Sequence, residues 1–162
     1  MAWDAYLHLE GIKGEATRKG HEEDIPLKSF SLGGSLPILS APGQPLQVAG
    51  RAQLSGFHFT KKSDGASPAL FNAMCNNKKF PDAKVTFYRA GSETSVPYIE
   101  YEFKNVVIAD LNWSGADGGE GIPEEAGSFY FGYIKVIYTV PNPDGTKKGV
   151  LEAEYNVETV DK

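Results

Sequence analysis

The sequence predicts a mainly β protein, a small antiparallel β-barrel or sandwich with one short flanking α-helix. Apolar and polar side chains alternate with a period of two through most of the 162 residues, which places successive side chains on opposite faces of a sheet. Helical spacing is confined to one segment near the middle, so no repeated strand-helix alternation supports a parallel sheet. Residues 1–162 are expected to form a single domain, because this length suffices for one hydrophobic core.

The N-terminal half contains three candidate strands, at residues 3–10, 25–32 and 46–59. In the first, Leu7 and Leu9 lie on the apolar face, and Tyr6 and His8 lie with charged residues on the other face. In the third, a bend is expected near Gly50 or Gly56, because glycine inside a strand favours a bulge or kink. Its apolar face is expected to carry Leu46, Val48, Ala52 and Leu54.

The C-terminal half predicts two strand pairs. Residues 83–90 and 98–111 form a hairpin through the turn-forming residues 91–95. Residues 129–140 and 150–160 form the second pair, because the prolines and the Asp-Gly step of residues 141–145 favour chain reversal.

The single helix is expected at residues 69–75, with the Ser67 hydroxyl as its N-cap and Pro68 at its first position. Its apolar face at helical spacing consists of Leu70, Phe71 and Met74. Cys75 is the only cysteine, which excludes an internal disulfide, and an inert, partly buried thiol is expected there.

Two loops stand out by composition. Residues 33–47 are long and unusually apolar, whereas residues 114–127 are rich in glycine and acidic side chains. Residues 129–140 are apolar on both faces, so that either the helix or another subunit covers the second face. Because loops run over the surface, an apolar loop is a candidate contact with a partner. The candidate self-assembly residues are Leu36, Pro37, Ile38, Leu39, Asp117, Glu120 and Glu124.

Charge and motif content argue against several classes of function. The net charge of −5 and the pI near 5.2 disfavour nucleic acid as a partner. His8, His21 and His58 are expected to lie far apart in different elements, without the spacing of a metal site, and no nucleophile elbow or nucleotide-binding motif is present. The acidic loop does not reproduce the ligand order of a calcium-binding loop. We expect no enzyme activity, no cofactor and no metal.

The first ten residues lack the basic and apolar regions of a secretory signal peptide, and charges interrupt every long apolar run. The protein is therefore expected to fold in the cytoplasm and to have no membrane-inserted segment.

Two groups of motifs resemble the haemolysin-coregulated protein (Hcp) family, the tube protein of the bacterial type VI secretion system. The N-terminal group is GIKGEAT at residues 11–17, HEEDI at 21–25 and FSLG at 30–33. The central group is FHFTKKSD at residues 57–64, SPAL at 67–70 and FPDAKV at 80–85. With the later hairpins, the resemblance spans nearly the whole chain.

The resemblance implies a homo-oligomer in which hexameric rings stack into a tube. It also implies a spike protein, contractile sheath proteins and effector proteins as partners, with effectors carried in the lumen. Export through the type VI apparatus would then need no cleaved signal peptide. Two other functions stay open. The residues themselves leave room for a monomeric β-barrel that binds a ligand or peptide in an interior pocket. A phage-type tail tube subunit is a closer relative of the function that the resemblance implies.

Overall fold

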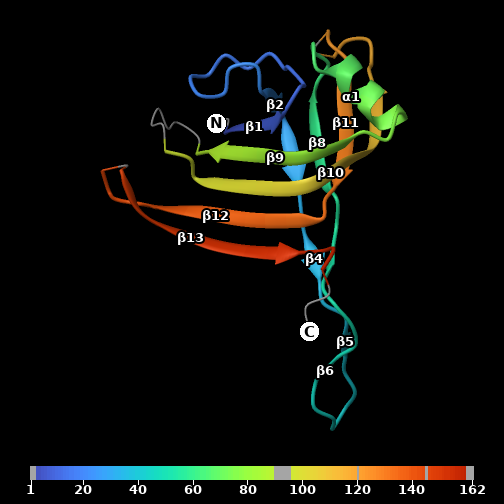
Figure 1. Ribbon diagram of the computed structural model, residues 1–162, viewed down its shortest axis with the longest axis vertical. Helices are drawn as coiled ribbons and strands as arrows, with labels where there is room; N and C mark the ends of the chain where they lie inside the picture. The colour runs from blue at the N-terminus through green and yellow to red at the C-terminus, as the bar shows by residue number, and fades with distance from the viewer. Residues whose placement is uncertain (1–2, 90–95, 120, 145, 160–162) are drawn as a thin grey trace.

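The computed structural model describes residues 3–89, 96–119, 121–144 and 146–159, and Figure 1 shows its arrangement. The turn expected at residues 91–95 lies outside the described residues. The elements are β1 (Asp4–Leu9), β2 (Ile25–Leu27), β3 (Ser29–Ser31), β4 (Gly34–Ser35), β5 (Ile38–Leu39), β6 (Gln47–Val48), β7 (Gln53–Leu54), β8 (Phe57–Lys62), α1 (Ser67–Cys75), β9 (Lys79–Tyr88), β10 (Ile99–Ser114), β11 (Glu124–Tyr130), β12 (Tyr133–Pro141) and β13 (Lys147–Asn156).

The main sheet has nine strands, and the predicted mainly β, antiparallel class is confirmed. The strand order is β2-β1-β9-β10-β11-β8-β3, while β12 pairs with β10 and β13 pairs with β12. All of these pairs are antiparallel. The predicted hairpins β9–β10 and β12–β13 are both present.

Strand β10 belongs to two layers of the fold. Its first part, from Ile99 to Lys104, pairs with β12, and its last part, from Val107 to Ser114, pairs with β11. The layers diverge at Asn105, which has a φ of 54°. In Figure 1, β12 and β13 accordingly run across the view while β8 and β11 run upright.

The expected strand at residues 25–32 is in fact two strands. Ile25–Leu27 pairs with β1, whereas Ser29–Ser31 pairs with β8 at the other end of the sheet order. At the change of direction, the Lys28 N–H donates a 2.7 Å hydrogen bond to the carbonyl oxygen of Thr60. Residues 25–31 therefore supply the first and the last strand of this sheet order, β2 and β3.

The expected strand at residues 129–140 is also interrupted. It belongs to β11 and β12, which separate at Gly132, whose N–H donates to the carbonyl oxygen of Lys104. Each of the two expected apolar faces is therefore divided between two strands with different partners. The helix packs against β10 and covers neither face of β12 as a layer of its own.

A cluster of phenylalanine side chains lies within a core that is otherwise mainly aliphatic. Phe57 and Phe129 stack with their ring centroids 5.0 Å apart, and Phe103 meets Phe129 edge to face at the same distance. Such pairs add stabilisation beyond the area that they bury. The fully buried phenylalanines are Phe57, Phe80, Phe103 and Phe129 with Phe59 nearly so.

The helix has the predicted position but not the predicted cap. Ala66 is the N-cap residue, and Ser67 is already inside the first turn. Asp64 instead accepts the Ala66 N–H at 3.0 Å through its carboxylate. The buried helix face contains Leu70 and Ala73.

Two further expectations for the helix are wrong. Phe71 is exposed, although its spacing placed it on the apolar face with Leu70. Cys75 is also exposed, at the end of the helix, and is not partly buried. Phe71 and Cys75 are four residues apart, so their side chains lie on the same side of α1.

Candidate self-assembly surfaces

The apolar loop expected at residues 33–47 is one half of a narrow two-stranded arm. The arm, residues 33–55, is held by the short pairs β4–β7 and β5–β6. The Ser55 N–H donates to the Gly33 carbonyl oxygen at the base, and the Gln44 N–H donates to the Ala41 carbonyl oxygen at the tip. Gly43 has a φ of 78°, which glycine adopts without strain. Figure 1 shows the arm extending away from the main sheet.

This arm replaces much of the single strand that we expected at residues 46–59. Leu46 and Val48 belong to the arm, and only Phe57–Lys62 joins the main sheet as β8. The apolar face expected for Leu46, Val48, Ala52 and Leu54 does not form, because the chain joins the main sheet only at Phe57.

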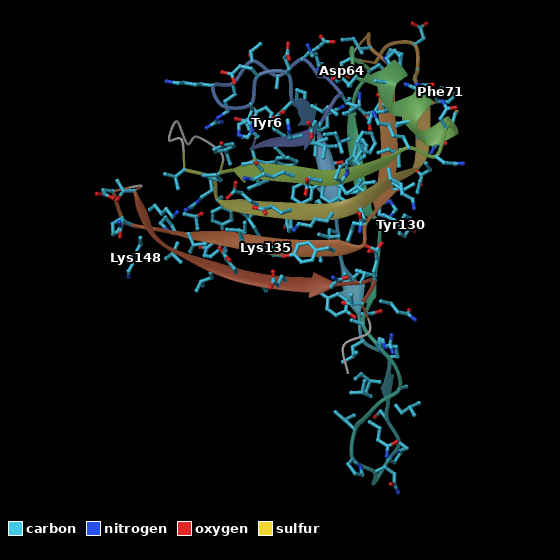
Figure 2. All side chains as sticks on the ribbon, in the orientation of Figure 1. Tyr6, Asp64, Phe71, Tyr130, Lys135 and Lys148 are labelled. Carbon is cyan, nitrogen blue, oxygen red and sulfur yellow. The ribbon has the colours of Figure 1, made fainter. Side chains whose placement is uncertain are left out.

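The arm carries its apolar side chains into solvent. No other element lies beside its outer part in Figure 2. Pro37 is half-buried against the arm itself. The exposed fractions of the large apolar residues are 46% for Leu36, 48% for Ile38, 58% for Leu39, 72% for Leu46 and 60% for Val48. An apolar patch of this kind on a soluble protein is typical of a protein contact site.

Strand β13 is a second uncovered surface. Among the described strands it pairs only with β12, so that its other edge presents unpaired backbone groups. Leu151, Tyr155 and Val157, in or just after this strand, are exposed. A long edge strand with exposed apolar residues is a template for pairing with another chain.

The acidic candidates lie away from the apolar ones. Glu124 is the first residue of β11 and forms an ion pair with Lys28 at 3.1 Å, while Asp117 is exposed in the preceding loop. Glu120 lies outside the described residues. In the β8–β11 pair, Glu124 is opposite Lys62, at the end remote from the arm. The structure therefore places the two predicted groups at opposite ends of these strands.

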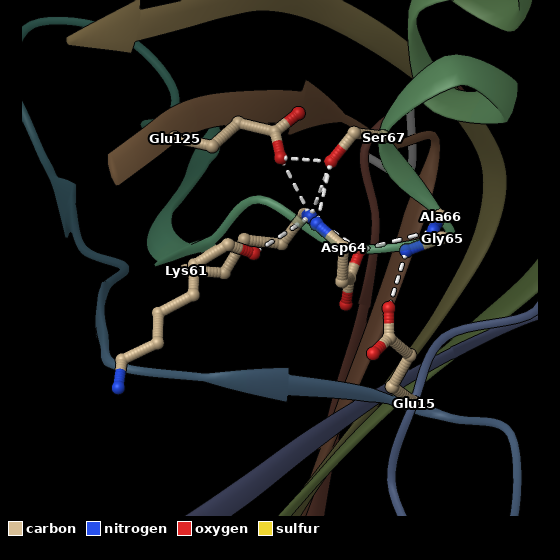
Figure 3. A network of polar contacts seen from close by, with 8 residues as sticks. Glu15, Lys61, Asp64, Gly65, Ala66, Ser67 and Glu125 are labelled. Atoms are coloured by element: carbon tan, nitrogen blue, oxygen red, sulfur yellow. Dashed lines mark hydrogen bonds and ion pairs between the residues drawn. The ribbon is translucent and has the colours of Figure 1, made fainter. Parts of the chain in front are cut away.

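A buried ionic network joins β8, β11 and the start of the helix. Lys61 and Glu125 are opposite each other in the strand register, and both side chains are 0% exposed. The Lys61 Nζ lies 2.6 Å from Glu125 Oε2 and 2.8 Å from Asp64 Oδ1. The Ser67 hydroxyl donates to the same Glu125 oxygen at 2.6 Å, as Figure 3 shows.

This network holds the turn between β8 and α1, because it joins Lys61, Asp64 and Ser67 of that turn and its flanks to Glu125 of β11. The adjacent Gly65 N–H donates to Glu15 at 2.7 Å and so connects the N-terminal loop. Sequence reasoning missed the network, although a signal was present: alternation places Lys61 on the same face as Phe57 and Phe59.

A second cluster brings together two histidines that we expected to be far apart. His8 Nδ1 and His21 Nδ1 lie 2.7 and 3.0 Å from the two carboxylate oxygens of Asp24. His21 Nε2 lies 2.7 Å from the Tyr88 hydroxyl, and Tyr6 stacks on the His21 ring. These contacts attach residues 14–24 to β1 and β9, beside an open hollow of about 1290 Å³ whose lining residues are mostly of polar or charged type.

Neither cluster is arranged to hold a metal ion. Within the described residues, no group of three or more histidine, cysteine, aspartate or glutamate side chains is arranged to hold a metal ion. The same part of the chain has no helix of the length and apolar character needed to cross a bilayer.

Comparison with known proteins identifies the class. Residues 6–138 match the family model described as "Type VI secretion system effector, Hcp". The protein Hcp1 of Pseudomonas aeruginosa is 31% identical over 149 residues, which cover 92% of this chain and 91% of the relative. These matches define a type VI secretion protein.

Solved structures agree with this class. A structure described as a type six secretion system protein superposes with a TM-score of 0.88 at 24% identity, covering 96% of each chain. Hcp1 of Salmonella typhimurium superposes with a TM-score of 0.78 at 25% identity, covering 97% of this chain and 96% of that one. The chain belongs to the Hcp family, whose members are structural, secreted proteins that form oligomeric rings.

Proposed function

We propose that the whole chain, residues 1–162, acts as one domain and as the structural subunit of a type VI secretion tube. Six copies close into a ring, and rings stack into the exported tube. The observation that carries the proposal is the arm, which presents five large apolar side chains to solvent in the isolated subunit. A soluble protein stabilises such a surface by covering it in an assembly.

The open edge of β13 supports the same proposal. Contacts between different surfaces of identical copies close into a ring when the rotation between copies permits it. Covering β13 with a neighbouring copy removes both its exposed apolar residues and its unpaired edge. The expected contact residues of the assembly remain Leu36, Pro37, Ile38 and Leu39 on the arm and Asp117 and Glu124 at the other end. Glu120, which lies outside the described residues, remains an expected contact from the sequence alone.

Family membership supports the remaining parts of the proposal. The tube engages a spike protein and contractile sheath proteins, and its lumen carries effector proteins. The chain is made in the cytoplasm and leaves the cell through the type VI apparatus without a cleaved signal peptide. Its role is structural and not catalytic.

The first test is the oligomeric state. Native mass spectrometry and light scattering are expected to show rings of six copies, and electron micrographs are expected to show stacked rings. A strict monomer at every accessible concentration contradicts the proposal.

The second test removes the apolar surface of the arm. Replacing Leu36, Ile38 and Leu39 together by Ser is expected to weaken assembly while far-ultraviolet circular dichroism stays unchanged, because these side chains lie outside the core. The matched control replaces three exposed glutamines of the same arm, Gln44, Gln47 and Gln53, by Ser. If the variant with Leu36, Ile38 and Leu39 replaced by Ser forms unchanged rings and tubes, these arm residues are not assembly contacts.

A further inference from the structure

An aromatic pair is exposed at the end of the molecule opposite to the arm. Phe71 on α1 and Trp113 near the end of β10 lie with their ring centroids 5.4 Å apart, and each is 44% exposed. Figure 2 shows Phe71 at one end of the longest axis and the arm at the other. Adjacent aromatic side chains that remain accessible are typical anchors of protein interfaces.

The arm is suited to enter an interface as a ligand. It is narrow, its described pairs β4–β7 and β5–β6 join two residues on each side, and a two-stranded ribbon of this kind has little stability alone. Its residues 33–55 contain one charged side chain, Arg51. Most of its surface is therefore transferred favourably from water to an apolar partner surface.

We propose that the arm of each copy binds the Phe71–Trp113 pair of a copy in the adjacent ring. This inference rests on the proposed tube function and assigns the acceptor surface for the arm. Because donor and acceptor lie at opposite ends of one chain, a displacement along the longest axis joins them and leaves both ends free to repeat the contact. Figure 1 shows β13 running across that axis, so the β13 edge serves the ring and the arm serves the stack.

Charge agrees with this assignment. Asp117 is exposed in the loop that follows β10, three residues beyond Ser114 and therefore at the same end as Trp113. Arg51 is exposed on the arm. Opposite charges on the two surfaces favour the head-to-tail contact over contacts between like ends.

The exposed Cys75 provides a reporter, because it is one helical turn from Phe71. We would introduce Leu39→Cys on the arm and treat assembled protein with thiol cross-linkers of increasing length. The expected product is a covalent ladder on a denaturing gel that extends beyond six copies, since each chain carries one donor and one acceptor.

Two control variants make the result specific. Leu39→Cys combined with Cys75→Ser is expected to give no ladder. Lys148→Cys, at an exposed position of β13, is expected to give none with the native Cys75. A ladder that ends at six copies places the arm contact inside one ring and overturns the assignment.

The outcomes also separate this inference from the proposed function. Stacked rings in micrographs without any cross-link refute the Phe71–Trp113 assignment and leave the tube intact. Absence of rings refutes the tube itself.

Tryptophan emission gives a measurement without new cysteines. In a Trp3→Phe variant, Trp113 is the only tryptophan, and its emission is expected to shift to shorter wavelength when rings stack. The arm variant with Leu36, Ile38 and Leu39 replaced by Ser is expected to lose this shift. An emission maximum that does not change between separate and stacked rings contradicts the burial of Trp113.

Discussion

Removal of the Lys61 ammonium group is expected to destabilise the fold strongly. The Lys61→Met variant keeps most of the apolar stem but leaves the buried Glu125 carboxylate with the Ser67 hydroxyl as its remaining donor. The other Glu125 oxygen, Oε1, is buried and already has no hydrogen-bond partner. Breaking a fully buried ion pair by removing one member costs about 3–5 kcal/mol, because an uncompensated charge remains in the interior.

Urea unfolding at a fixed protein concentration measures this loss, since assembly makes the apparent stability depend on concentration. For a chain of this size, the loss corresponds to a melting temperature lower by roughly 10 °C. The double variant Lys61→Met/Glu125→Met is expected to be more stable than Lys61→Met alone, because it removes the stranded carboxylate. The control Lys148→Met makes the same substitution at an exposed position of β13 and is expected to change stability by less than about 0.5 kcal/mol.

Two results would refute this reasoning. One is a loss of less than about 1 kcal/mol in Lys61→Met, which would mean that the carboxylate finds other compensation. The other is a double variant whose loss equals the sum of the two single losses, since additivity means that the two groups are not energetically coupled.

Two further predictions concern packing and pH. Gly14→Ala is expected to destabilise the fold by about 1–3 kcal/mol, because its Cβ would lie 2.4 Å from the backbone oxygen of Asp24. Gly149→Ala has no atom within 4 Å of the added Cβ and serves as the control in the same unfolding assay. Burial raises the pKa of Tyr101, so the folded state favours the neutral phenol. Stability is therefore expected to fall as the pH rises above about 10, and Tyr101→Phe should lessen that fall in denaturation curves at pH 9 and 11; equal falls in both proteins would contradict this.

Strands whose partners are close in sequence could be predicted well. The pairs β9–β10 and β12–β13 follow from local alternation and turn residues. Residues 25–32 and 46–59 also alternate, but each of these segments changes its partner strand along its length, and the alternation does not show where. The register of a strand depends on its distant partner. A segment that changes from one partner strand to another can therefore keep the same local alternation.

The polar clusters could not be predicted from spacing alone. Lys61 and Glu125 are separated by 64 positions in the chain and meet because β8 pairs with β11. His8 and His21 meet because the Asp24 carboxylate forms a hydrogen bond with each imidazole ring. The apolar loop at residues 33–47, in contrast, could be found from composition, because Leu36, Ile38 and Leu39 interrupt a segment rich in proline and glycine. Its pairing with residues 47–54 into an arm was not predicted, because those residues were assigned to a strand of the main sheet.

The two-layer path of β10 has a mechanical consequence. The chain from Ile99 to Ser114 passes without interruption from the layer of β12 and β13 to the layer of β11 and the helix. A pull on the β13 side therefore reaches the helix side through covalent backbone, and shear between the layers must break several hydrogen bonds of β10 together. In the proposed tube, a subunit pushed along its length by its neighbours would be loaded through one strand that spans both layers.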